Sequence, residues 1–385
     1  MEQKDFINPC GNLVKNKDGY LTFIPNSLPP TINYDESLAS LVAEASLQLG
    51  ALSGIGKLMP DPNLLIRPYL KREAVLSSKI EGTQASILDV FRFEARGMEK
   101  EDEEDTKRVT EVVNYVYALD ACLRRIKSNV PIDVSMIKSA HKILMLNVRG
   151  QEKHPGEFRT VQNWIGLEGT KIEDARYVPS LPEHVNQLMA DLEKFIQNPP
   201  GRIPVLVQCA MLHYQFEAIH PFSDGNGRIG RLLIPVLLAD RGLLDQPLLY
   251  LSAYIERNKV KYYDLLLDVS QKSEWVEWIR FFLHGVISQA TDTVKNIQSL
   301  MALKADYEKK LIDKKASGSA TRLIDNLFTN PITTIPHAMA YLHVTYPPAK
   351  NAVECLVDMG ILTELSPERK HGRMFMAHDI VKILT

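Results

Sequence analysis

Apolar residues recur at three- and four-residue spacing over most of this chain, which is the pattern of helices with one buried face. The first such segment, SLASLVAEASLQLGAL, begins soon after Tyr34. A second helix is expected from Pro68, a residue suited to a first helical turn, to Ile80. Residues 1–35 are rich in proline, asparagine and glycine, and they predict an irregular arm.

The helical pattern continues through the middle of the chain. Within it, the charged run Glu99–Asp105 predicts a solvated junction, and Trp275 and Trp278 are expected in the core. The ranges expected to be helical are 83–127, 133–147, 182–198, 202–219, 228–241 and 260–300. The fold class is therefore mainly α. One exception is Gln162–Pro179, where NWIG, EGTKI and ARYVP predict a short β-hairpin.

The pattern changes after Lys315. The small residues Ala316–Ala320 predict a linker, and Thr321–Thr329 predicts a helix. A helix-turn-helix-like pair near 334–342 and 347–359 follows, and then the hairpin-like segment ILTELSPERKHGRMFMA. Three helices followed by a β-wing are typical of a winged-helix domain.

Composition narrows the class of protein. The 385 residues are 45% apolar, enough for two or three domains, and the net charge of −2 argues against nucleic acid or an anionic membrane as the main partner. The cysteines are scattered and form no CxxC pair, which favours reduced thiols over a disulfide framework or a zinc site. They are Cys10, Cys122, Cys209 and Cys355. The start MEQKDFINPC has no apolar signal core, and no uninterrupted apolar run reaches membrane length. We therefore expect a cytoplasmic protein that does not enter a membrane.

The segment LHYQFEAIHPFSDGNGRIGRLLIPVLLAD predicts a helix, a tight loop and a second helix that begins near residues 226–228. The free N–H groups at a helix start bind anions, and glycines there let phosphate oxygens approach the backbone. Arg228 and Arg231 share one face of that helix and suit a polyphosphate. Asp224 can ligate Mg²⁺, and His220 can act as a general base. Each residue alone has an ordinary structural explanation. Their combined spacing favours a nucleoside triphosphate site.

This run resembles the Fic motif, H-x-F-x-D/E-G-N-G-R-x-x-R, and it matches every specified position. The resemblance implies a helical Fic fold and transfer of AMP from ATP to a protein hydroxyl. It implies that His220 deprotonates a Ser, Thr or Tyr and that Asp224 binds Mg²⁺. The resemblance further assigns the anion nest to Gly225, Asn226 and Gly227, and the phosphates to Arg228 and Arg231. The related Doc branch has Lys in place of Gly227, so glycine favours nucleotidyl over phosphoryl transfer.

Other segments also resemble the family. PGEFRTVQNWIG, residues 155–166, is similar to the segment that leads into the flap, a hairpin that would align a target by β-augmentation. A plain surface hairpin is the alternative. Tyr262 and Tyr263 resemble a pair that lines the base of the nucleotide, although core packing would also explain them. Gln215 and Arg257 are weaker candidates for the ATP pocket. His213 is expected to be packed in the core.

The segment LSSKIEGT, residues 76–83, fits a second family signature, S/T-x-x-x-E-G/N, which marks an inhibitory helix. Its signature residues here are Ser77, Glu81 and Gly82. Gly82 is suited to the position just after a helix, which places Glu81 at the negative end of the helix dipole, where it requires a cation. We expect Glu81 to pair with Arg231 and to remove the site of the γ-phosphate. A solvent-exposed glutamate at a helix end is the alternative.

These expectations define four regions. Residues 1–127 would carry the arm and the inhibitory helix at about 68–82, residues 128–300 the catalytic core, residues 301–317 a helix end and linker, and residues 318–385 the winged helix. The last region has six basic and six acidic residues, so docking of a target protein or dimerisation is favoured over DNA binding. Two alternative functions remain. One is a DNA-binding regulator whose Fic core senses ATP, and the other is an enzyme that removes AMP with water positioned by Glu81.

Overall fold

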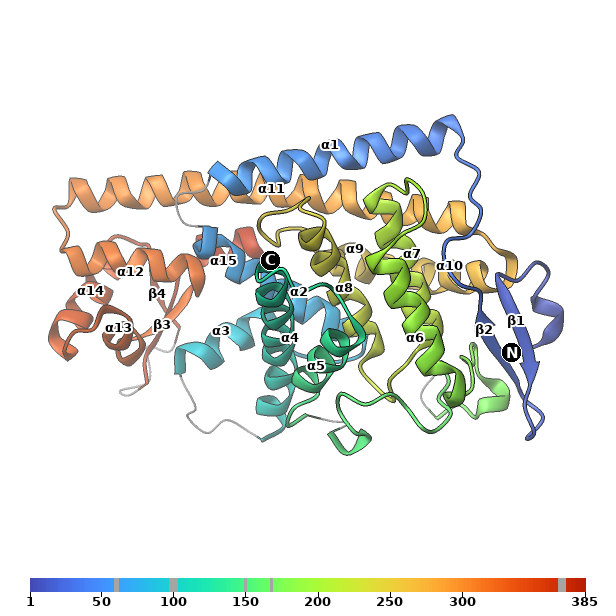
Figure 1. Ribbon diagram of the computed structural model, residues 1–385. Coiled ribbons are helices and arrows are strands. Elements are labelled where there is room, and N and C mark those ends of the chain that lie inside the picture. The colour runs from blue at the N-terminus through green and yellow to red at the C-terminus, as the bar shows by residue number, and fades with distance from the viewer. Residues whose placement is uncertain (59–61, 97–102, 149–150, 167–168, 366–371) are drawn as a thin grey trace.

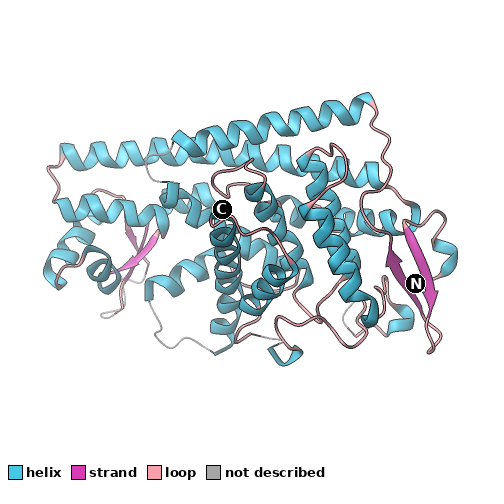
Figure 2. Cartoon of the chain, viewed as in Figure 1, coloured by secondary structure: helices cyan, strands magenta, loops and turns pink. Residues whose placement is uncertain are grey.

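The protein is a mainly helical molecule with two small sheets at opposite ends (Figure 2). A computed structural model describes residues 1–58, 62–96, 103–148, 151–166, 169–365 and 372–385. Helices up to the end of the central region are α1 (Glu36–Leu58), α2 (Pro62–Ile80), α3 (Ile87–Arg96), α4 (Glu103–Lys127), α5 (Val134–Leu144), α6 (Pro182–Gln197), α7 (Val205–Ile219), α8 (Asn226–Asp240), α9 (Ser252–Arg257), α10 (Lys259–Lys272) and α11 (Trp275–Asp313). Short 3₁₀ turns are η1 (Gln3–Asp5), η2 (Gln151–Lys153) and η3 (Ile172–Asp174).

The centre of the fold is the pair α7 and α8. Nearly every residue of both helices is buried, because α4, α5 and α6 cover them on one side and α10 and α11 on another. A helix that is apolar on all faces is stable only in such an enclosed position. The loop between α7 and α8 is therefore held by a rigid support on both sides. Trp278 lies in this core, as predicted, and donates its indole N–H to the carbonyl of Ala210 at 2.8 Å.

Two long helices, α1 and α11, lie side by side along one edge of the molecule (Figure 1). Leu38, Leu41, Leu49 and Leu52 of α1 are buried. Residues Glu36–Lys57 also form one helix that is long and apolar enough to cross a membrane, judged by length and composition alone. The expectation from the sequence concerned uninterrupted apolar runs, and polar residues such as Glu44 and Gln48 interrupt this helix. Small residues supply much of the helix, so its apolar character does not appear as an uninterrupted run.

The irregular arm predicted at the N-terminus contains a β-hairpin instead. Strand β1 (Gly11–Lys15) pairs antiparallel with β2 (Leu21–Pro25), and Gly11 lies opposite Pro25. Gly19, with φ of 93°, supplies the left-handed residue that the connecting turn requires. The Pro and Asn content of the flanking residues obscured two short strands on either side of an Asp-Gly turn.

Helix α2 begins at Pro62, so the prediction that it begins at Pro68 is wrong. Pro68 lies inside the helix, where it removes one backbone hydrogen bond. Pro62 occupies the favourable first turn, and packing on α4, α9 and α12 compensates for the interior proline. The C-terminal end was predicted correctly at Ile80, and Gly82 has the positive φ of 97° expected after a helix.

Only part of the predicted flap hairpin forms. Ile165 and Tyr177 exchange two backbone hydrogen bonds of 2.8 and 3.1 Å, and this antiparallel bridge is the part of the predicted hairpin that is present among its described residues. Residues 167–168 lie outside the described part of the chain. On the other side, the N–H of Phe23 donates to the carbonyl of Val178 at 2.9 Å, so β2 lies beside the flap.

The C-terminal region has the predicted helices and a small sheet. Its elements are α12 (Gly318–Thr329), β3 (Ile332–Thr334), α13 (Ile335–Leu342), α14 (Tyr346–Asp358), β4 (Thr363–Glu364), β5 (Met374–Met376) and α15 (His378–Leu384), with strand order β3-β5-β4. The predicted linker is shorter, because Ser317 caps α12 by accepting the N–H of Ala320. Residues 366–371, including most of the predicted wing tip, lie outside the described residues, as do residues 99–102 of the predicted charged junction. The winged-helix assignment stays a prediction.

Candidate active site

The loop between α7 and α8 begins with His220, whose backbone is left-handed with φ of 49°. It ends at Gly225, with φ of 76°, and α8 begins at Asn226. Asn226 fixes the loop with two hydrogen bonds of 2.8 Å. Its carbonyl oxygen accepts the N–H of Phe222, and its amide donates to the carbonyl of Phe222. The first turn of α8 therefore points its free N–H groups toward the loop, as the anion nest requires.

A buried arginine that the sequence did not assign a role holds the start of this loop. The guanidinium of Arg159 donates to the carbonyl of His220 at 2.9 Å and to that of Ser180 at 2.6 Å. Asn163 donates to the carbonyl of Phe222 at 2.9 Å. These bonds tie the segment that leads into the flap to the loop. The position of His220 is thus determined by residues about sixty positions earlier in the chain.

A second histidine supports the loop from α5. His141 is 2% exposed and stacks on Phe222 with 3.8 Å between the ring centroids. Its Nδ1 accepts the N–H of Gly156 at 2.8 Å, so its Nε2 carries the proton and donates to the carbonyl of Asp224 at 2.9 Å. Burial lowers the pKa of His141 to about 4, which keeps this tautomer neutral. Nothing in the sequence near His141 indicated this role.

The chemistry of His220 fits a general base. Its Nδ1 lies 3.3 Å from the carbonyl of Glu217, which can only accept, so Nδ1 carries the proton and Nε2 has a free lone pair. Burial lowers the pKa of His220 to about 4. The imidazole is therefore neutral near pH 7 and ready to take a proton.

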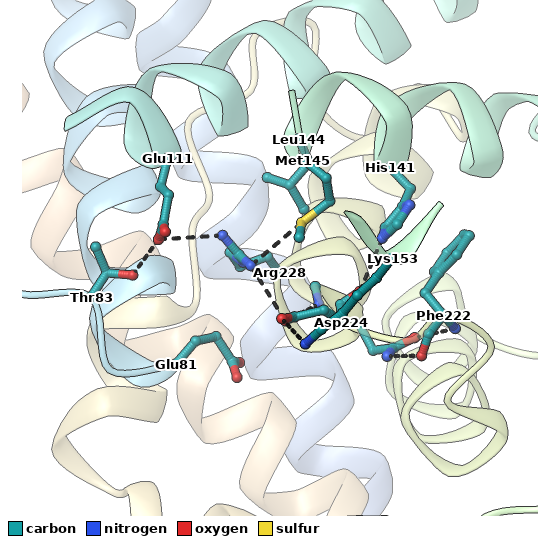
Figure 3. A network of polar contacts seen from close by, with 12 residues as sticks. Glu81, Thr83, Glu111, His141, Leu144, Met145, Lys153, Phe222, Asp224 and Arg228 are labelled. Atoms are coloured by element: carbon teal, nitrogen blue, oxygen red, sulfur yellow. Dashed lines mark hydrogen bonds and ion pairs between the residues drawn. The ribbon is translucent and has the colours of Figure 1, made fainter. Parts of the chain in front are cut away.

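Asp224 lies at the solvent side of the loop. Lys153 contacts one carboxylate oxygen at 3.1 Å, and Nη2 of Arg228 lies 3.7 Å from the other (Figure 3). Burial would raise the pKa of Asp224, but these two cations outweigh it and hold the pKa below its ordinary value. Among the described residues no group of three or more His, Cys, Asp or Glu side chains could hold a metal. One ionised carboxylate fits Mg²⁺ in the way that the ion binds nucleotides, through few protein ligands and the phosphates.

Arg231 and Glu81 form the ion pair that the sequence predicted. Nη2 of Arg231 lies 2.7 Å from Oε1 of Glu81, and the same guanidinium donates to the hydroxyl and the carbonyl of Ser77, both at 2.9 Å. Burial would raise the pKa of Glu81, but the charge of Arg231 outweighs it and holds the pKa below its ordinary value. A Cβ placed on Gly227 would lie 2.2 Å from Oε1 of Glu81. The carboxylate therefore occupies the space directly over the start of α8.

The remaining candidates lie in different surroundings. Tyr262 is buried, and its hydroxyl shares a 2.8 Å hydrogen bond with His213, which is packed as predicted. Tyr263 is half-buried against Tyr262. Gln215 donates to the carbonyl of Asn26 in the arm. Arg257 is exposed, with Asp292 of α11 at 3.8 Å.

Comparison with known protein families gives matches over two parts of the chain, one of which includes the loop between α7 and α8. A model of the Fic/DOC family N-terminal region matches residues 39–124, and a model of the Fic/DOC family matches residues 131–238. The protein adenylyltransferase fic-1 of Caenorhabditis elegans is 29% identical over 136 residues, which are 34% of this chain and 25% of the relative. The protein adenylyltransferase Fic of Aedes aegypti is 31% identical over 176 residues, which are 44% of this chain and 31% of the relative. The matches therefore span less than a third of either relative.

Solved structures share the fold. A Fic family protein from Desulfovibrio desulfuricans G20 is similar over 91% of this chain and 98% of its own, with a TM-score of 0.57 and 20% identity. A fragment of Fic-1 from C. elegans covers 69% of this chain and 74% of its own, with a TM-score of 0.51 and 18% identity. At this level of identity the likeness establishes the arrangement of the helices.

Proposed function

The chain belongs to the Fic/DOC family, and from this premise we propose that it is a self-inhibited protein adenylyltransferase that transfers AMP from ATP to a Ser, Thr or Tyr hydroxyl of a target protein. The observation that carries the proposal is the loop between α7 and α8. It joins a neutral His220 with a free Nε2 to a helix start whose face carries two buried arginines, Arg228 and Arg231. A base for a hydroxyl and a cradle for a polyphosphate are the two parts that this transfer needs.

In the proposed reaction, Nε2 of His220 takes the proton of the target hydroxyl as its oxygen attacks the α-phosphorus of ATP. The bond from the α-phosphorus to the bridging oxygen of the β-phosphate breaks, and pyrophosphate leaves. The free N–H groups of Asn226 and Gly227 and the guanidinium of Arg228 stabilise the charge on the phosphates. Asp224 would hold Mg²⁺, which when bound neutralises phosphate charge.

The self-inhibition is supported by the contacts of Glu81. Its carboxylate forms an ion pair with the guanidinium of Arg231 and lies over Gly227, where a phosphate oxygen would otherwise approach. ATP bound with Glu81 in place would lose the γ-phosphate contact to Arg231, and its α-phosphate would be turned away from attack. Release of Glu81 therefore activates the enzyme.

The partners in this proposal are ATP and a target protein that the C-terminal region or the flap recognises. A homodimer is the alternative use of the C-terminal region, and DNA binding is not favoured, because that region has no net charge. The proposed location is the cytoplasm, without insertion into a membrane. The cytoplasm is proposed because the cysteines are scattered and free, as is usual in a reducing compartment, and because the reaction needs ATP.

The test compares the wild type, His220→Ala and Glu81→Gly after incubation with labelled ATP and Mg²⁺. We expect Glu81→Gly to add AMP to itself or to an added protein faster than the wild type, and His220→Ala in the Glu81→Gly background to add none. Intact-mass spectrometry identifies the added group. If Glu81→Gly adds no AMP, the transfer is wrong. If AMP is removed from a modified protein by the wild type and not by Glu81→Gly, the reverse reaction is the function.

A further inference from the structure

A second carboxylate from the N-terminal region reaches the inhibitory segment. Thr83, two residues after Glu81, donates its hydroxyl to Oε2 of Glu111 at 2.6 Å (Figure 3). Its backbone N–H donates to the carbonyl of Ser78 at 3.0 Å. Thr83 is therefore fixed at its side chain by α4 and at its backbone by α2. Glu81 lies within the short segment that these two bonds close.

The same carboxylate lies near the first arginine of the motif. Oε2 of Glu111 is 3.6 Å from Nη1 of Arg228, and both side chains are largely buried, with 13% and 5% exposed. Among the described residues, Nε and Nη1 of Arg228 have no hydrogen-bond partner. Its Nη2 lies 3.6 Å from the sulfur of Met145 and 3.7 Å from Oδ1 of Asp224. Arg228 is thus compensated in charge by Glu111, while its Nε and Nη1 have no hydrogen-bond partner among the described residues and can bind an anion.

The segment that carries Glu81 needs such a fixed point. Helix α2 ends at Ile80, and Gly82, with φ of 97°, gives the next residues wide conformational freedom. A carboxylate on a free segment would lose conformational entropy each time it docked on Arg231. Anchoring the residue on the far side of Gly82 removes part of that cost. The contact of Lys259 with the carbonyl of Ile80 at 2.6 Å does the same on the near side.

We propose that the Thr83–Glu111 hydrogen bond is a latch that holds the inhibitory Glu81 on Arg231, and that Glu111 is a positioning residue for this inhibition. The proposal rests on the proposed function of the site. Through the shared carboxylate, the latch links the inhibitory segment to Arg228. Both arginines of the motif are therefore balanced by carboxylates of the N-terminal region, Arg231 by Glu81 and Arg228 by Glu111.

The test uses Thr83→Val, which removes the hydroxyl and keeps the shape of the side chain, with Thr83→Ser as the matched control that keeps the donor. Losing a hydrogen bond to a charged group corresponds to roughly a tenfold effect. We expect Thr83→Val to raise AMP transfer by about that factor and Thr83→Ser to leave it near the wild type. In the Glu81→Gly background Thr83→Val should cause no further increase, because the latch acts through Glu81.

Hydrogen exchange at residues 78–83 gives a readout that does not depend on activity. We expect faster exchange in Thr83→Val and wild-type exchange in Thr83→Ser. Unchanged exchange in Thr83→Val overturns the latch, even if Glu81→Gly is inactive and the proposed function fails. The latch is also overturned if Thr83→Val transfers AMP at the wild-type rate while Glu81→Gly is active. It is overturned as well if Thr83→Val accelerates AMP transfer in the Glu81→Gly background as much as it does in the wild type.

Discussion

Two ion pairs, one made by a residue of helix α2 and one by a residue just after it, look alike and differ in what surrounds them. Lys71 pairs with Glu94 of α3 at 2.6 Å, and Glu81, just past the end of α2, pairs with Arg231 of α8 at 2.7 Å. In both pairs the cation is buried and about a third of the carboxylate side chain is exposed, 36% for Glu94 and 33% for Glu81. Distance and burial alone do not distinguish them.

The Lys71 pair is enclosed by protein groups. Lys71 also donates to the carbonyl of Thr329 at 3.3 Å and lies over the ring of Phe91, while Asn330 donates to Glu94 at 3.2 Å. Burial lowers the pKa of Lys71, although Glu94 opposes the shift. These contacts join α2 and α3 to the C-terminal region, and no anion could take the place of Glu94 without separating them.

The Glu81 pair faces a site that can accept another anion. Gly227 leaves room beneath the carboxylate, and the start of α8 favours any negative charge placed there. A phosphate could therefore replace the Glu81 carboxylate, and Arg231 would keep an anionic partner. An ion pair acts as a switch when its environment offers a substitute for one partner, and as a structural contact when it does not.

The largest effect should come from replacing each of the two carboxylates by alanine in a separate variant. We expect Glu81→Ala to raise AMP transfer on the order of 10²-fold, the scale for regaining one phosphate-binding donor. Glu94→Ala should not accelerate the reaction. It should lower the free energy of unfolding by on the order of 1–3 kcal/mol, because the buried Lys71 loses its partner. Water that enters the partly exposed position of the carboxylate offsets part of this loss. Labelled ATP and urea denaturation measure the two effects. Activation by Glu94→Ala would contradict the distinction.

A smaller effect tests the contact between Glu81 and Gly227. In Gly227→Ala the added Cβ would overlap the carboxylate, so we expect a loss of about 1–3 kcal/mol in the free energy of unfolding. In the Glu81→Gly background the same substitution should cost much less, because the overlapping group is gone. A double-mutant cycle measured by denaturation gives the coupling. Equal costs in both backgrounds would show that Glu81 does not occupy this space.

The smallest effect concerns pH. A base must be unprotonated to act. Burial lowers the pKa of His220 to about 4, and loss of the Glu81 charge lowers it further, so the kcat/KM of Glu81→Ala should fall only at about pH 4 or below and not near 6.5. The pKa of Glu81 is held below its ordinary range, so Glu81 stays ionised between about pH 7.5 and pH 5.5. The ratio of the rates of Glu81→Ala and the wild type should therefore be constant from about pH 7.5 to 5.5. A ratio that shrinks across this interval would indicate that Glu81 becomes protonated within it.

The sequence predicted the groups that lie close together along the chain. His220, Asp224 and the two arginines lie within twelve residues, and the position of Glu81 before Gly82 indicated a helix end in need of a cation. Whether the flap aligns a target and whether Tyr262 or Tyr263 contacts the nucleotide stay predictions.

The sequence did not predict the supports of the loop, because they depend on packing between distant segments. Arg159 and His141 act through backbone carbonyls of residues 220 and 224, and a carbonyl acceptor leaves no trace in the identity of its own residue. Pro68 misled the prediction of α2 for a similar reason. Its local preference for a first turn is outweighed by the packing of α2 on other helices, above all α4, α9 and α12.

The length of α11 has a practical consequence for the design of shortened proteins. Its 39 residues span roughly 58 Å, and the far end packs against α12 and α15. The sequence suggests a cut after Lys315, but such a cut would strip α11 of these neighbours and leave Lys71 and Glu94 without Thr329 and Asn330. A shortened protein would therefore report damage to α2 as well as the absence of the C-terminal region. Point substitutions of partly exposed residues of α14, such as Lys350→Glu, probe that region without disturbing α2, the helix that precedes Glu81.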